Sequence, residues 1–226
     1  MAVPGMKRIP HLLPVLALLV TAFAADRMKP LFEAPFTTEL GAGWFWVRED
    51  PAAWRIKDGA LEVRTFTGGM WAKTHEEQNI LLRTPPDIAG GTLAIEVVLD
   101  NEPTGRFEHA GLVWYYDDEN WVVLNKECYV DKPKVIFVPV KAGRPTPVQG
   151  KGVSYEERTV SLRMLITGEE ITGQYRKTKK DAWQTIGRGT LPAQGKARVG
   201  VLTGYAPKDA EHWVRFRNFR IYPLGE

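Results

Sequence analysis

Cysteine is almost absent from this chain of 226 residues, which contains only Cys128. A single cysteine excludes an intrachain disulfide, so the fold must be stabilised by its hydrophobic core. A chain of this length can bury most of its apolar surface without covalent cross-links. Because no second cysteine exists and no histidine is adjacent in sequence, we expect Cys128 to be a small buried apolar side chain.

Histidine and serine are also few. Beyond the N-terminal segment the histidines are His75, His109 and His212. None of them has metal-ligand spacing with another. The serines, Ser154 and Ser161, do not lie in a nucleophile elbow. The sequence therefore predicts no cofactor and no serine-based catalysis.

Neither sign of charge is in excess. The chain has 30 Lys and Arg against 27 Asp and Glu. Residues 1–24 hold two of the basic residues, Lys7 and Arg8, and no acidic one, so the remainder has a net charge of +1. A nucleic-acid-binding protein needs basic residues clustered along a groove. The sequence therefore predicts no nucleic-acid partner.

Long hydrophobic runs are missing except near the N-terminus. The apolar stretch 12–24 follows Lys7 and Arg8 and ends in Ala22-Phe23-Ala24. It is shorter than the roughly 20 residues of a membrane span, and its end matches the small-x-small pattern of a cleavage site. We expect residues 1–24 to be a signal peptide and the protein to be secreted or periplasmic, with no other membrane contact. An uncleaved N-terminal anchor is the alternative.

Helical periodicity is missing as well. From residue 44 to residue 222 the chain reads as short β-type runs separated by turn signals, for example Lys57-Asp58-Gly59 and Pro85-Pro86. There is no internal repeat and no interdomain linker. Many short strands with regular turns are typical of a β-sandwich or barrel, so we predict one all-β domain over residues 25–226.

The most informative segment is the predicted β-hairpin 110–129, in which Asp118 and Glu119 form the tip. Counting back from that tip predicts four facing pairs: Tyr116 with Trp121, Trp114 with Val123, Leu112 with Asn125, and Ala110 with Glu127. One face of the hairpin would then carry Trp114, Tyr116, Trp121, Asn125 and Glu127. The cluster 117–120, Asp-Asp-Glu-Asn, also offers oxygen ligands for calcium, although a hairpin turn explains the same residues.

Several segments resemble a known superfamily. They are 43–64, with its Trp-rich strand and "W-x-x-x-x-G-x-L" pattern, 79–85, 109–127, 160–166, 183–187 and 197–202. Together they resemble concanavalin A-like jelly-roll domains, including the accessory C-terminal domain of β-xylosidases and bacterial regulation-of-enolase-like proteins of unassigned function. The resemblance implies an antiparallel two-sheet β-sandwich with a concave face that meets carbohydrate in many members. Related sandwiches hold a structural calcium near the chain ends, and the sequence assigns no residues to one here.

Two positions depart from the pattern of the relatives. The turn before Trp183 reads Lys177-Thr-Lys-Lys-Asp-Ala, which is more basic than usual and lacks a glycine. Val123 stands where many relatives carry a lysine, so one polar group is missing from the expected concave face.

Carbohydrate recognition is the first functional hypothesis. Aromatic planes stack on the apolar faces of sugars, while amide, carboxylate and guanidinium groups bond their hydroxyls. The predicted groove residues are Trp71, Trp114, Tyr116, Trp121, Asn125, Glu127 and Arg163. The competing interpretation is that the aromatic residues belong to the core and that Arg163 pairs with Glu127. The expected partner is an oligo- or polysaccharide, bound without catalysis.

Two other functions stay open. A glycoside hydrolase or polysaccharide lyase would need a second carboxylate beside Glu127, and Glu96 on another strand is a candidate. The Glu-x-Asp-x-x-Glu motif of glucanases with this fold is absent. A cell-surface protein-interaction module is the third hypothesis, because interfaces favour tryptophan and the chain contains eight tryptophan residues.

Overall fold

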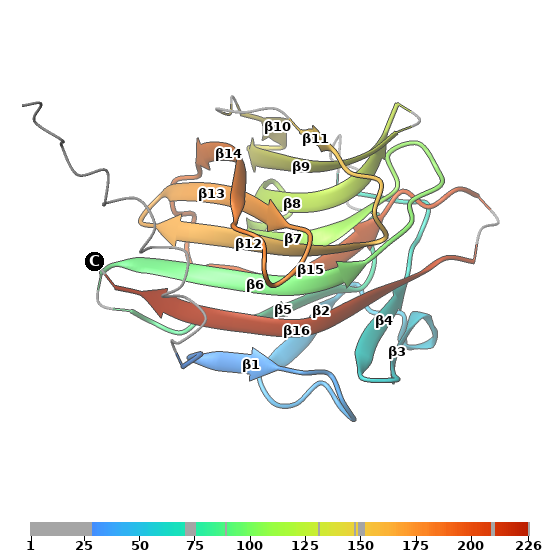
Figure 1. Cartoon of the computed structure of the whole chain (residues 1–226), viewed down its shortest axis with the longest axis horizontal. Coiled ribbons are helices and arrows are strands. Elements are labelled where there is room, and N and C mark those ends of the chain that lie inside the picture. Colours follow the sequence, from blue (N-terminus) through green and yellow to red (C-terminus); the bar gives the residue numbers. More distant parts are fainter. Residues whose placement is uncertain are drawn as a thin grey trace, which may run out of the picture.

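A computed structural model describes residues 29–70, 76–88, 90–130, 132–146, 148, 152–208 and 211–225. The expected signal peptide 1–24 lies outside these residues. Within them, sixteen strands form two antiparallel eight-stranded sheets, which curve over one another as a sandwich (Figure 1). The predicted all-β jelly-roll architecture is confirmed. In the described part of the chain, no helix is long and apolar enough to cross a membrane.

The first sheet, sheet A, has the strand order β14-β13-β12-β6-β16-β4-β3, with β1 paired to β16. Its strands are β1 (Phe32–Ala34), β3 (Trp54–Lys57), β4 (Ala60–Arg64), β6 (Thr92–Asp100), β12 (Thr159–Thr167), β13 (Glu170–Arg176), β14 (Gln184–Thr190) and β16 (Trp213–Leu224). A 3-10 turn, Pro51–Ala53, precedes β3, and the Asp50 side chain caps it by accepting a hydrogen bond from the Ala52 amide.

The second sheet, sheet B, has the order β10-β9-β8-β7-β15-β5-β2, with β11 paired to β9. Its strands are β2 (Trp44–Val47), β5 (Ile80–Arg83), β7 (His109–Asp117), β8 (Asn120–Tyr129), β9 (Lys132–Lys141), β10 (Arg144–Pro145), β11 (Val153–Ser154) and β15 (Arg198–Gly204).

The core lies between the sheets and follows from the period-two alternation of the strands. On β6 the inward side chains are Leu93, Ile95, Val97 and Leu99. From sheet B the facing layer includes Leu112, Trp114, Val122 and Leu124. Every one of these side chains is buried. About every second side chain of a central strand therefore points into the intersheet core.

Sheet B carries a second apolar layer on its outer face, the face that points away from the intersheet core. This layer consists of Met70, Ile80, Leu82, Val113, Tyr115, Trp121, Val123, Val140 and Leu202. As a result, residues 121–128 of β8 are buried on both faces of the strand. Polar side chains in the second half of β8 must therefore find partners away from bulk water.

The β7–β8 hairpin has a different register from the one predicted. The tip is as expected, with Asp117 opposite Asn120, but a β-bulge between Tyr115 and Asp117 leaves Tyr116 out of the pairing. The facing pairs are therefore Tyr115 with Trp121, Val113 with Val123, Gly111 with Asn125, and His109 with Glu127. A one-residue shift moves the side chains of one strand to the opposite face. The predicted common face for all five hairpin residues is wrong for this reason.

Lys126 is the one lysine among the largest fully buried side chains of the described residues. It points inward from β8, and its ammonium donates hydrogen bonds of 2.6 Å to the backbone carbonyls of Asn101 and Glu157. Burial lowers the pKa of Lys126 to about 8. The lysine thus ties β8 to two connecting segments at one end of the sandwich.

We expect Lys126→Met to lower the free energy of unfolding by about 2 kcal/mol, because it leaves buried carbonyl groups without a donor while keeping the apolar stem. Urea denaturation at pH 7 measures this loss. Lys132→Met, at an exposed position of neighbouring β9, is the matched control and should change stability by less than about 0.5 kcal/mol. Equal stabilities of the two variants would contradict the structural role of Lys126.

Candidate functional site

A pocket of about 380 Å³ opens on the outer face of sheet B, where β8 ends. Its lining residues are Phe107, Glu127, Tyr129, Ile136, Val138 and Tyr205. They come from four places in the chain: the loop before β7, strand β8, strand β9 and the segment after β15. We refer to this hollow, defined by those six residues, as the outer pocket. It joins three aromatic rings and two aliphatic side chains around one carboxyl group.

The backbone at the rim of the outer pocket is strained. Phe107 and Tyr205 have positive φ angles of 68° and 56°, and Val130, which follows Tyr129, has a φ of 50°. Bulky and β-branched side chains rarely adopt this left-handed conformation, and such strain concentrates at functional sites. The conformation is fixed by backbone hydrogen bonds from Phe107 to the Cys128 carbonyl (2.7 Å) and from Tyr205 to the Gly68 carbonyl (3.0 Å).

Close approach of the backbone also holds the Tyr205 ring. A Cβ atom on Gly69 would lie 2.0 Å from the ring edge of Tyr205, so only glycine fits at this position. The pair Gly68-Gly69 therefore allows the chain to pass against the ring.

A buried acid–base group lies beside the pocket. His109 on β7 is paired with Glu127 on the neighbouring strand β8. The Nε2 atom of His109 is 3.3 Å from the Glu77 carboxylate, and its Nδ1 atom donates a 2.9 Å hydrogen bond to the Phe107 carbonyl. Burial acts to lower the pKa of His109, but the hydrogen bond to Glu77 and the charges of Glu77 and Glu127 outweigh it, so the net pKa is raised. The contact with Glu77 thus favours the protonated form of His109.

Glu127 is the acidic residue among the described residues that line the pocket. Its side chain is buried, and it makes no hydrogen bond or ion pair in the described part of the chain. Burial raises the pKa of Glu127 to about 7, and the positive charge of His109 opposes that rise. The carboxyl group can therefore bind a ligand either as a proton donor or as an anion near neutral pH.

Asn125 lies one pleat away from Glu127 on the same face of β8. Its Oδ1 atom is buried without a hydrogen-bond partner. Opposite it is Gly111, where an added Cβ atom would approach that oxygen to 2.7 Å. Asn125 is thus on the predicted face but beneath the surface, and it does not line the outer pocket.

The remaining predicted groove residues do not converge. Trp114 belongs to the intersheet core and Tyr116 packs against it, which is the competing interpretation from the sequence. The bulge in β7 is the physical reason, because it turns both rings to the inner face. Trp121 is on the outer face but only 1% exposed, and its indole N–H donates to the Asp118 carbonyl. Trp71 lies outside the described residues.

Arg163 is on the wrong sheet for the predicted groove. It extends from β12 on the outer face of sheet A, whereas Glu127 is on sheet B. Its guanidinium contacts Glu96 at 3.5 Å, donates to Gln174 at 2.9 Å and lies 4.2 Å from the Trp183 ring centroid. Both the shared groove and the suggested pair of Arg163 with Glu127 are therefore wrong. Glu96, the candidate second carboxylate, is on β6 and therefore also on sheet A, apart from Glu127.

Of the six predicted residues that the structure describes, Glu127 alone lines the outer pocket, and whether any of the predicted residues binds a ligand stays a prediction. Sequence reasoning missed Phe107, Tyr129, Tyr205 and His109. Period-two alternation from Glu127 could have found Tyr129, because residues i and i+2 of a strand share a face. Phe107 and Tyr205 lie in connecting segments, and no pattern in the sequence brings them to the end of β8.

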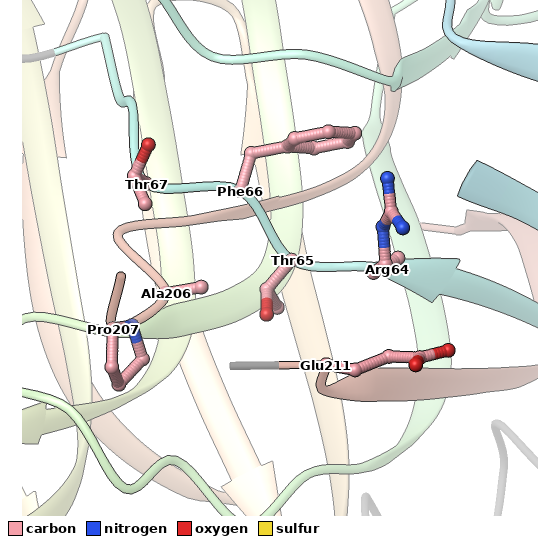
Figure 2. A pocket seen from close by; sticks show the side chains of 7 residues that line it. All are labelled: Arg64, Thr65, Phe66, Thr67, Ala206, Pro207 and Glu211. Atoms are coloured by element: carbon pink, nitrogen blue, oxygen red, sulfur yellow. The ribbon is translucent and has the colours of Figure 1, made fainter. Parts of the chain in front are cut away.

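A second hollow, of about 310 Å³, lies between the segment after β4 and the segment after β15. Its lining residues are Arg64, Thr65, Phe66, Thr67, Ala206, Pro207 and Glu211. Figure 2 shows residues 64–67 crossing this hollow, with Arg64 and Glu211 toward one end and Thr67 and Pro207 toward the other. The Arg64 guanidinium is 5.3 Å from the Phe66 ring centroid and the Thr65 hydroxyl donates to the His212 carbonyl. These internal contacts make it a weaker candidate than the outer pocket.

The acidic hairpin tip is explained by turn chemistry. The Asp117 carboxylate accepts from the Glu119 amide and the Asn120 side chain, both at 2.8 Å. The Asp118 carboxylate binds Arg48 and the Tyr115 hydroxyl, both at 2.8 Å. Among the described residues, no group of three or more His, Cys, Asp or Glu side chains could hold a metal ion.

The raised pKa of Glu127 predicts a pH-dependent stability. Between its usual value of 4.5 and about 7 the folded protein binds more protons at this carboxyl than the unfolded chain, so stability falls as pH rises through that window. We expect Glu127→Gln to remove up to about 3 kcal/mol of this fall, measured as the free energy of unfolding in urea at pH 5 and pH 8. Glu169→Gln, at an exposed turn, should behave as the parent protein does. Parallel pH profiles for the parent and Glu127→Gln would show that folding does not raise the pKa of this carboxyl group.

Comparison with known proteins identifies the family to which this fold belongs. The profile of the β-xylosidase C-terminal concanavalin A-like domain matches residues 33–221. No curated protein sequence matches the chain significantly. Among solved structures, the GH43 protein BlXynB from Bacillus licheniformis is similar with a TM-score of 0.73 and 20% identity, covering 85% of this chain and 39% of that one.

Two further structures are similar. The xylan β-1,4-xylosidase from Bacillus halodurans C-125 has a TM-score of 0.71 and 21% identity over 84% of this chain and 38% of that one. A functionally unknown protein from Saccharomyces cerevisiae has a TM-score of 0.63 and 16% identity over 81% of this chain and 98% of that one. The chain thus spans less than half the length of the two enzymes and nearly all of the yeast protein. By the family match, which extends over most of its length, the chain belongs to the family of β-xylosidase C-terminal concanavalin A-like domains.

Proposed function

We propose that this chain is an exported, non-catalytic carbohydrate-recognising protein and that the outer pocket is its binding site. The observation that carries the proposal is the convergence of three aromatic rings, from separate segments, on one buried carboxyl group. Two of those rings belong to residues held in a left-handed backbone conformation. Strain of this kind persists only where the surrounding structure enforces it.

The chemistry of the outer pocket suits a sugar ring. Phe107 and Tyr129 are 36% and 44% exposed, so the part of each ring that Arg106 and Lys134 leave uncovered is open to the apolar C–H face of a pyranose. Glu127, at the base, can accept from a hydroxyl group when ionised and donate to one when protonated. The pocket volume of about 380 Å³ is within the usual range of small-ligand sites, so it would take the end of an oligosaccharide rather than a long chain.

The relatives support a carbohydrate-related role for the chain. Two of the structures described above are a GH43 protein and a xylan β-1,4-xylosidase. This chain corresponds to only part of each, so it would act as an accessory module that holds a saccharide. Export through the N-terminal segment would place it where polysaccharides are met.

A hydrolase is the second candidate function, and one observation favours it. Glu127 has a pKa of about 7, which is suited to a general acid at neutral pH. Glycoside hydrolysis also needs a second carboxylate. Glu77 is bonded to His109 and only 1% exposed, and Glu96 is on the other sheet. Release of reducing ends from a bound glycan over hours, lost in Glu127→Gln, would establish the hydrolase function in place of the binding function.

We expect Tyr129→Ala to weaken binding of the best ligand from a glycan array about tenfold, because a stacking ring is removed from the rim. Titration calorimetry measures the loss. Phe45→Ala is the matched control, since Phe45 is 41% exposed on β2 and does not line the outer pocket. If no glycan binds, or if both variants lose affinity equally, the outer pocket is not a sugar site. The exposed aromatic rim would then indicate a protein-interaction module.

A further inference from the structure

We propose that the outer pocket selects a cationic saccharide, holding the protonated amine of an amino sugar against the Glu127 carboxylate and between the rings of Phe107, Tyr129 and Tyr205. This inference rests on the proposed function, because it names the saccharide class for the same pocket. It follows from the charge of the lining, from the disposition of the neighbouring charges and from the aromatic walls.

Among the described residues that line the outer pocket, the charged side chain is a carboxyl group. Of these six residues, Glu127 is the one with a carboxyl group, and none is a lysine, arginine or histidine. The other five are three aromatic and two aliphatic residues. A carboxylate among such side chains is poorly solvated, so a ligand that brings a positive charge gains an ion pair in a site of low polarity.

The charged groups around Glu127 do not neutralise it. His109, opposite it on β7, is bonded to Glu77, and that pair has no net charge when His109 is protonated. Lys134, opposite it on β9, makes no ion pair in the described part of the chain. Its ammonium lies 5.1 Å from the Tyr129 ring centroid instead. Among the described residues, no cationic side chain forms an ion pair with Glu127, so its carboxylate is left to a ligand whenever it ionises.

The aromatic walls also favour a cation. The face of an aromatic ring attracts ammonium and guanidinium groups, and cages of such rings recognise organic ammonium ligands. Two rim rings already carry cations: Lys134 over Tyr129, and the Arg106 guanidinium at 4.8 Å from the Phe107 ring centroid. Phe107 and Tyr129 are inclined at 60° with their centroids 6.0 Å apart, so they form adjoining walls rather than a flat platform.

Binding of a cationic ligand and loss of the proton from Glu127 are coupled at this site. Because burial raises the pKa of Glu127 to about 7, a bound cation favours the ionised form and releases a proton from the pocket. Affinity for a permanently charged ammonium compound should therefore rise as pH increases from 6 to 8. His109 would act in the same direction if it lost its proton in this range, so the variant at Glu127 is needed to separate the two.

The test compares three tetrasaccharides by titration calorimetry at pH 7 and low salt. They are the fully deacetylated glucosamine tetramer, its N-acetylated counterpart and xylotetraose. The inference predicts at least tenfold tighter binding of the deacetylated tetramer than of the acetylated one. Glu127→Gln should abolish that preference, so that the deacetylated and acetylated tetramers bind this variant within about twofold of each other. Glu127→Asp should keep part of the preference, and Glu169→Gln, exposed on the turn after β12, should keep all of it.

A second measurement uses tetramethylammonium, whose charge does not change with pH. Its affinity for the parent protein should rise at least threefold between pH 6 and pH 8 and stay constant for Glu127→Gln. Near-ultraviolet circular dichroism confirms that each variant is folded. If Glu127→Gln does not fold, Glu127→Asp and the comparison of the tetrasaccharides on the parent protein still decide the matter.

The outcomes separate the two proposals. Tighter or equal binding of the acetylated tetramer or xylotetraose would overturn the inference and leave the proposed function standing. Binding of none of the three would overturn the inference, and the glycan array would then decide whether the proposed function stands. A preference for the deacetylated tetramer that survives in Glu127→Gln would overturn the inference as well, because the counter-ion would then lie elsewhere.

Discussion

The β-bulge in the β7–β8 hairpin is the constraint on which the candidate site depends. It leaves Tyr116 out of the ladder and so shifts the whole of β7 by one residue against β8. Without the bulge Ala110 would face Glu127; with it His109 does. The same shift sends Trp114 into the intersheet core. A single extra residue thus decides that the carboxyl group has a histidine as its neighbour and that the tryptophan is structural.

The second consequence concerns solvation. Sheet B is apolar on both faces over most of its centre, so β8 has almost no exposed side chain before Tyr129. Polar groups there are satisfied internally, as with Lys126 and three backbone carbonyls, or they remain under-solvated, as with Glu127. An under-solvated carboxyl group costs stability in the free protein and gains most from a ligand. The outer pocket lies beside this carboxyl group, at the end of β8, where the strand approaches solvent.

The rim of the outer pocket is built differently from its base. Glu127 and Tyr129 are fixed by the strand alternation of β8, whereas Phe107 and Tyr205 are fixed by strained loop conformations and by the close passage of Gly69. A ligand would therefore meet a rigid strand on one side and two locked loop residues on the other. Such preorganisation lowers the entropy lost on binding.

The sequence by itself determined the all-β fold, the hairpin with its tip at Asp118 and Glu119, and the common face of Trp121, Asn125 and Glu127, because these follow from turn chemistry and from the period of two. It could not determine the facing residues of β7, since a bulge has no reliable signature and reverses the face of every residue beyond it. Nor could it separate Arg163 from Glu127, because alternation tells which residues share a face but not which sheet a strand joins. The meeting of Phe107, Tyr129 and Tyr205 around Glu127 was decided only by the tertiary structure, which brings together segments that no local interaction connects.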